Sequence, residues 1–152
     1  MKIAWIYLDK RGAAIDALKD YAAMAYIIEN HADDLEETRA VATNPPSSAM
    51  TGMPGRHNPQ AYETRLAASL DEIDVLKERY RRALEYMEWF QPAWEALTDE
   101  EQFLLNECFV REDINKTEAV GNVSDKLHIE RTHVYRRKGK AIDHLALMLY
   151  GK

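Results

Sequence analysis

Residues 127–145, LHIERTHVYRRKGKAIDHL, carry the densest positive charge of a chain whose formal net charge is −6. From Lys126 to the end there are seven basic and two acidic residues, a local net charge of +5. Arginine can form two hydrogen bonds with a guanine edge, and basic side chains can neutralise backbone phosphates. The chemistry open to this cluster is recognition of duplex nucleic acid, although a basic run alone is equally typical of a solvated helix face.

Apolar residues at a particular spacing accompany the basic cluster. A helix-turn-helix needs a bulky residue beside a small one on its first helix, two buried apolar residues in the turn, and an apolar residue returning from its second helix. Val123, Leu127, Ile129 and Val134 meet this spacing, with Ser124 as the small residue. The pattern recurs in many helical proteins, but its coincidence with the basic run favours DNA binding.

The second helix of this motif divides its polar side chains between two tasks. We expect base reading by residues near its amino end, namely Arg131, Thr132, His133 and Arg136. We expect phosphate contacts, which add affinity without sequence information, from Arg137, Lys138 and Lys140. The helix should then return to the core through Ala141, Ile142, Leu145, Met148 and Leu149.

Two long amphipathic helices are predicted ahead of this motif. The first, over 13–42, has apolar residues at spacings of three and four: Ala14, Leu18, Tyr21, Ala25, Ile28, Ala32 and Leu35. The second, over 59–94 after an Asn58-Pro59 start, has a heptad stripe of Leu66, Ile73, Tyr80, Met87 and Trp94, filled by Leu76, Ala83 and Phe90 and widened by Leu70 and Leu84. The proline-rich stretch 43–58 should join them as a connector or a binding flap. Residues 1–96 are thus expected to form an antiparallel hairpin used for oligomerisation or partner binding.

Residues 97–152 are expected to form a separate three-helix unit. Pro92 should kink or end the long helix before it. Thr98 and Glu101 have the capping-box spacing that starts a helix over about 99–110. Two further helices, over about 116–126 and 130–149, would complete an all-α fold.

Other classes of protein find little support. The chain has no glycine-rich phosphate loop and no hydrolase or metalloprotease motif, and none of its five histidines lies three or four residues from another. We therefore expect no catalytic residues, no metal and no cofactor. The amino-terminal MKIAWIYLDKRG has too short an apolar run for a signal peptide. Cys108 is predicted to be a core thiol of a protein in a reducing compartment. The expected location is the cytoplasm of a bacterial host cell, without membrane association.

The segment from LTDEEQ through AVGNVSDKLHIERTHVYRRKGKAIDHLALMLYG resembles the region-four-like helix-turn-helix of bacterial primary sigma factors. It more closely resembles small phage-encoded transcriptional regulators of the ArpU and RinA type. The matching positions are Leu127, Ile129, Arg131, Val134, Tyr135, Arg136, Arg137, Lys138, Lys140, Ala141, Leu149, Tyr150 and Gly151. The resemblance covers about the last 55 residues and implies a phage or prophage transcriptional regulator that binds duplex DNA.

Two residues depart from the sigma-like pattern. His128 stands where glycine is usual in the turn, and Glu130 stands where serine usually begins the recognition helix. Glutamate suits the helix dipole but repels phosphate.

Two alternative functions stay open at this point. One is a phage packaging protein similar to a small terminase subunit. The other is a helical interaction module that binds no DNA and contacts, for instance, RNA polymerase. Together, these hypotheses predict duplex DNA, RNA polymerase and a second copy of the chain as partners, with a dimer favoured.

Overall fold

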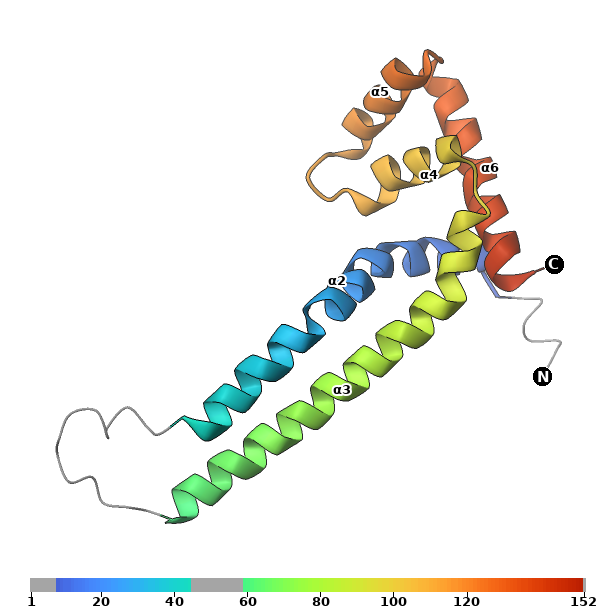
Figure 1. The fold of residues 1–152 in the computed structure, drawn as a ribbon. Coiled ribbons are helices and arrows are strands. Elements are labelled where there is room, and N and C mark those ends of the chain that lie inside the picture. Colours follow the sequence, from blue (N-terminus) through green and yellow to red (C-terminus); the bar gives the residue numbers. More distant parts are fainter. Residues whose placement is uncertain (1–7, 45–58, 152) are drawn as a thin grey trace. The chain divides into compact units, whose positions relative to one another are not determined.

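The computed structural model describes residues 8–44 and 59–151, and Figure 1 labels its helices. They are α2 (Lys10–Thr43), α3 (Pro59–Glu95), α4 (Asp99–Leu105), the π-helical turn η2 (Asn106–Val110), α5 (Lys116–Leu127) and α6 (Arg131–Tyr150). No strand occurs in these ranges, which confirms the all-α prediction. None of the helices described there has the length and apolar character needed to cross a membrane. Asn58 and most of the 43–58 connector lie outside the described residues.

The chain divides into two compact units by its internal contacts. Unit 1 joins residues up to Met24 with residues from Tyr86 onward, and unit 2 comprises Ala25–Glu85. The sequence instead predicts one boundary between two units, near residue 97. The reason for the difference is a shared core, because Ala14 and Leu18 of α2 and Phe90 of α3 belong to the same buried cluster as Leu145 of α6.

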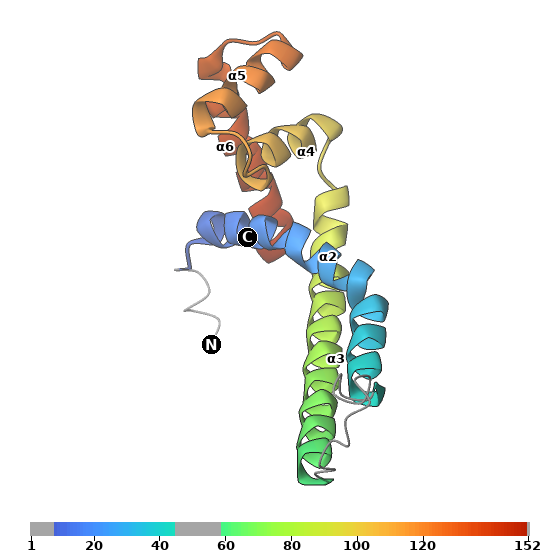
Figure 2. The ribbon, with the colours of Figure 1, turned by 90° about the vertical axis from the view of Figure 1, so that its left-hand side faces the viewer.

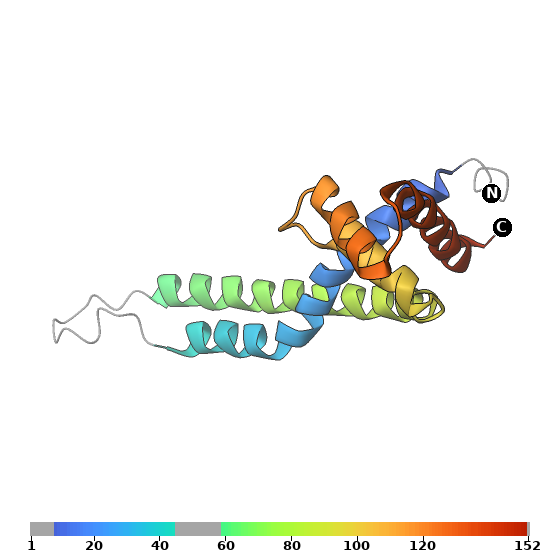
Figure 3. The same ribbon diagram turned by 90° about the horizontal axis from the view of Figure 1, so that it is seen from above.

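Unit 2 is a pair of antiparallel helical arms, visible side by side in Figure 3. The ring of His31 stacks on that of Tyr80, with centroids 4.0 Å apart. Arg65 donates hydrogen bonds to the carbonyl oxygens of Val41 and Asn44, at 2.5 and 3.0 Å. Residues late in α2 thus meet residues early in α3, as a hairpin requires, and Arg65 also satisfies carbonyls that the end of α2 leaves open.

The seam of unit 2 follows the predicted heptads only in part. Ile73, Leu76 and Ala83 are buried as expected. Leu70 and Leu84, predicted to widen the stripe, are 54% and 42% exposed, and Ala32 of α2 is exposed as well. A two-helix unit has one seam, so residues at the edge of a wide apolar stripe have nothing to cover them.

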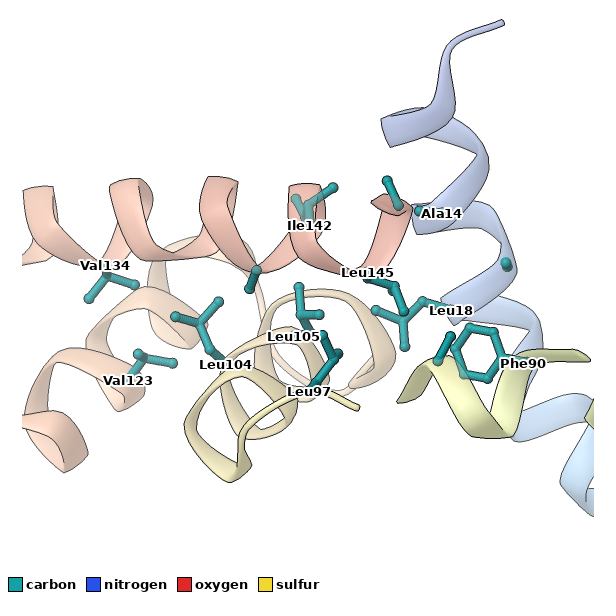
Figure 4. Packing of buried hydrophobic residues seen from close by; sticks show 14 of the residues in the cluster. Ala14, Leu18, Phe90, Leu97, Leu104, Leu105, Val123, Val134, Ile142 and Leu145 are labelled. Atoms are coloured by element: carbon teal, nitrogen blue, oxygen red, sulfur yellow. The ribbon is translucent and has the colours of Figure 1, made fainter. Parts of the chain in front are cut away.

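Unit 1 holds the main hydrophobic core, shown in Figure 4. Its largest fully buried side chains, each at most 1% exposed, are Leu18, Phe90, Leu104, Leu105 and Leu145. The rings of Tyr21, Tyr86 and Trp94 lie around Phe90 with centroids 5.3 to 6.1 Å away. Ala141, Ile142 and Ala146 of α6 complete the core, whereas Met148, predicted to join it, is 45% exposed.

The helix ends in unit 1 follow local chemistry. Helix α2 begins three residues before the predicted start because the Asp9 carboxylate accepts a hydrogen bond from the Gly12 N–H at 3.0 Å. Helix α3 runs on through Pro92 to Glu95, so this proline does not end it. The predicted capping box at the start of α4 is confirmed, with Thr98 and Glu101 bonded reciprocally. Beyond this point α4 and α5 both pack against α6, as Figure 1 and Figure 2 show.

Candidate nucleic-acid interface

The turn between α5 and α6 is built on His128. Its backbone is left-handed, with φ 54° and ψ 44°, and it is the only non-glycine residue with positive φ in the described part of the chain. The N–H groups of His128 and Ile129 both donate to the Ser124 carbonyl, and the Ser124 hydroxyl donates to the Ile129 carbonyl at 2.6 Å. Histidine therefore takes the conformation for which glycine is usual in such turns.

Beneath the turn, the apolar positions of the predicted helix-turn-helix come together. Val123 of α5 and Val134 of α6 are fully buried and face each other in Figure 4. Leu127 and Ile129 are partly buried and pack against the same cluster. Packing among these four residues determines which side of α6 faces the core.

The residues predicted to read bases lie in the first two turns of α6. Arg131, Thr132, His133 and Arg136 are all exposed. The Arg131 guanidinium lies over α5, where a Cβ added at Gly121 would be 3.8 Å from its Nη2. Within residues 8–44 and 59–151, the guanidinium groups of Arg131 and Arg136 form no hydrogen bond or ion pair, so their donors are available to a ligand.

The three residues predicted to contact phosphate differ in their surroundings. Arg137 forms an ion pair with Glu100 of α4. The Lys138 ammonium lies 4.9 Å from the ring centroid of Phe109, and its side chain is half-buried, so it is less outward than the sequence indicated. Lys140 is exposed. Of the three, Lys140 is the readiest to meet an external phosphate.

The acidic residue at the start of α6 makes no capping hydrogen bond with its side chain. Glu130 is the N-cap, with φ −66° and ψ 150°, but its side chain bonds no backbone N–H of the first turn. The exposed carboxylate next to Arg131 lowers the positive potential at the amino end of the helix.

Side chains from α2 brace the middle of α6. The Arg11 Nε lies 2.8 Å from the Asp143 carboxylate, and its Nη2 donates to the Gly139 carbonyl at 3.3 Å. Lys10 donates to the carbonyl of Gly151, the C-cap residue of α6.

From α4, the Glu101 carboxylate meets His144 Nδ1 at 3.0 Å. Burial opposes ionisation of Glu101, but its hydrogen bonds with Thr98 and His144 prevail and lower its pKa.

The buried acid Glu107 joins α5 to the π-helical turn. It is 8% exposed, pairs with Arg111 at 3.1 Å and accepts from the Asn122 amide at 3.5 Å. Next to it, Cys108 is partly buried, and burial raises the pKa of its thiol. These features agree with a structural thiol. No group of three or more His, Cys, Asp or Glu side chains in the described ranges is placed to hold a metal ion.

Sequence reasoning missed three residues that shape this surface. Ser124 was read only as a small residue, whereas its hydroxyl closes the turn. Glu100 and Arg11 were assigned no role, yet each pairs with a residue of α6. Glu100 follows the recognisable cap Thr98, which was a usable signal, but nothing in the sequence indicated that Arg11 reaches α6.

No family model, no curated protein and no solved structure matches the chain.

Proposed function

We propose that the protein is a sequence-specific DNA-binding transcriptional regulator that inserts the amino end of α6 into the major groove. One observation carries the proposal: Arg131, Thr132, His133 and Arg136 are exposed in the first two turns of α6, whereas Val134 among them is fully buried and holds this end of the helix against α5. Such an arrangement suits a recognition helix, whose first turns contact base edges. The phage or prophage setting rests on the resemblance of residues 127–151 to phage regulators.

Salt-dependent binding to duplex DNA is the first test. Each phosphate contact contributes a slope of about −0.9 to the plot of log affinity against log salt. The triple variant R137A/K138A/K140A should bind duplex DNA more weakly and with a shallower slope. The matched control K77A/R79A/R82A removes three positive charges from exposed positions of α3 and should retain the wild-type slope. Equal losses in the two variants would contradict docking through α6.

Sequence specificity needs a separate measurement. Selection from a pool of random duplexes should enrich a common site, and R136A should weaken binding to that site much more than binding to unselected DNA. Loss of a bidentate contact to a base would cost about 1 to 3 kcal/mol of discrimination. Equal losses on both DNAs would reassign Arg136 to phosphate.

We further propose that unit 2 mediates self-association, as a dimer. Support comes from the exposed Leu70 and Leu84, which lie two heptads apart and therefore on one side of α3. Sedimentation should give a dimer for the wild type and a monomer for L70K/L84K. V75K, a change at an exposed valine outside this stripe, should stay dimeric. A large ring would instead favour the packaging alternative.

A further inference from the structure

A cleft lies between the first turn of α4 and the middle of α6, both within unit 1. Its lining residues are Thr98, Glu100, Glu101, Leu104, Arg137 and Lys140. Two of these side chains are cationic and two are anionic, so the cleft is close to electrically neutral as it stands. The cationic pair consists of residues that the sequence assigned to DNA phosphate.

The two glutamates of the cleft differ in how firmly they are held. Glu101 accepts from the Thr98 N–H at 2.9 Å and also bonds His144. Both oxygens of its carboxylate are therefore engaged in hydrogen bonds within the protein. Glu100 has Arg137 as its one partner among the described residues, and the two side chains are 45% and 46% exposed. An exposed ion pair of this kind is weak and opens readily in water.

We propose that the cleft receives one backbone phosphate of the bound duplex, and that Glu100 takes the place of that phosphate in the free protein. This inference rests on the proposed DNA binding and specifies how part of that site is regulated. A phosphodiester carries one negative charge and offers two oxygens to a guanidinium, as a carboxylate does. Exchange of one for the other therefore keeps the charge on Arg137 balanced.

Lys140 makes the exchange favour the phosphate. It lines the same cleft one helical turn after Arg137, and in the described residues it has no ion-pair partner. A phosphate in the cleft would interact with both cations, whereas Glu100 is paired with Arg137 alone. The carboxylate of Glu100 thus restrains binding to any duplex, and a duplex that is also held by base contacts overcomes this restraint.

The test compares two acidic residues in the first turn of α4. E100Q and D99N each remove one negative charge at an exposed position, but only Glu100 lines the cleft and pairs with Arg137. With a short duplex of unselected sequence, measured by fluorescence anisotropy, E100Q should bind about two- to fivefold more tightly than D99N, the gain expected from freeing one exposed ion pair. The advantage should shrink as salt rises, because screening weakens the same pair in the wild type. Circular dichroism melting of both variants checks that α4 is retained.

A double-mutant cycle assigns the effect to Arg137. In an R137Q background, E100Q should bind no more tightly than D99N. An E100Q advantage that survives without Arg137, or equal affinities of E100Q and D99N in the wild-type background, would overturn the inference. If the wild type shows no salt-dependent binding to duplex DNA, the proposed function itself is contradicted.

Inorganic phosphate, titrated at constant ionic strength and followed by NMR, distinguishes the DNA backbone from a free anion. No saturable binding is expected, because a lone phosphate lacks the additional contacts of a duplex. Saturable binding that R137Q abolishes would reassign the cleft to a small anion.

Discussion

The Ser124 hydroxyl donates a hydrogen bond to the Ile129 carbonyl and closes the turn that orients α6. Ser124→Ala should lower the free energy of unfolding by about 1 to 2 kcal/mol, because it removes this bond and leaves a partly buried carbonyl without its partner. Urea denaturation followed by circular dichroism measures the change. Thr117→Ala, at an exposed position of the same helix, is the control and should change stability little. An unchanged midpoint for the Ser124 variant would mean that the turn holds without the hydroxyl.

His128→Gly should stabilise the protein by up to about 1 kcal/mol. The left-handed backbone of residue 128 costs an L-residue about 1 to 2 kcal/mol and costs glycine nothing, although glycine loses more backbone entropy on folding. The midpoint of urea denaturation should rise. His133→Gly, at an exposed position inside α6, should have the opposite sign and lose about 1 kcal/mol. A loss of stability in both variants would mean that the histidine side chain contributes to the turn.

Glu130→Ser should both stabilise α6 and strengthen DNA binding. Serine at an N-cap can accept from the first-turn N–H groups that Glu130 leaves without a side-chain acceptor, for a gain of about 0.5 to 1 kcal/mol. Glu130→Gln separates the two effects, since it removes the charge without supplying a good cap. Both variants should bind duplex DNA more tightly than the wild type at low salt, and only the serine variant should melt at a higher temperature. Weaker DNA binding by both would instead indicate that the carboxylate accepts from a base, as a cytosine amino group would allow.

The lowered pKa of Glu101 predicts a specific pH dependence of stability. The folded-state pKa lies below the ordinary value of 4.5, so the ionised carboxylate stabilises the folded state above that value. The stabilisation is lost as the pH falls through the lowered pKa. In chemical denaturation over this acidic range, wild-type protein should therefore lose more stability than Glu101→Gln. His144→Gln leaves the Thr98 bonds in place and should remove only part of the difference. Parallel curves for wild type and Glu101→Gln would contradict the structural role of this carboxylate.

The helices were predictable where the sequence has strong local signals. The Thr98–Glu101 spacing located the start of α4, and the spacing from Val123 to Val134 located the turn and the buried side of α6. These features depend on residues that are close together in the chain. Propensity and periodicity act at that range, so a sequence reveals them.

Features that depend on distant segments could not be predicted. Arg11 and Asp143 are far apart in the chain, and neither has a neighbour that indicates the pairing. The π-helical turn at Asn106–Val110 and the burial of Glu107 likewise depend on packing against α5. Lys138 was expected to face outward from its place in a basic run, but the ring of Phe109 on another helix draws its ammonium inward. Tertiary contacts of this kind override what a charge pattern indicates.

The segments that form unit 1 determine which shortened versions of the chain can fold. Its core takes Ala14 and Leu18 from the start of α2 and Phe90 from the end of α3, so the unit is discontinuous in sequence and unit 2 is in effect an insertion within it. A fragment beginning near residue 97 would expose the face of α6 that these residues cover. A chain in which both arms are shortened by the same number of heptads would keep every residue of the unit 1 core. We therefore expect the fold to tolerate a change of arm length better than a truncation near residue 97.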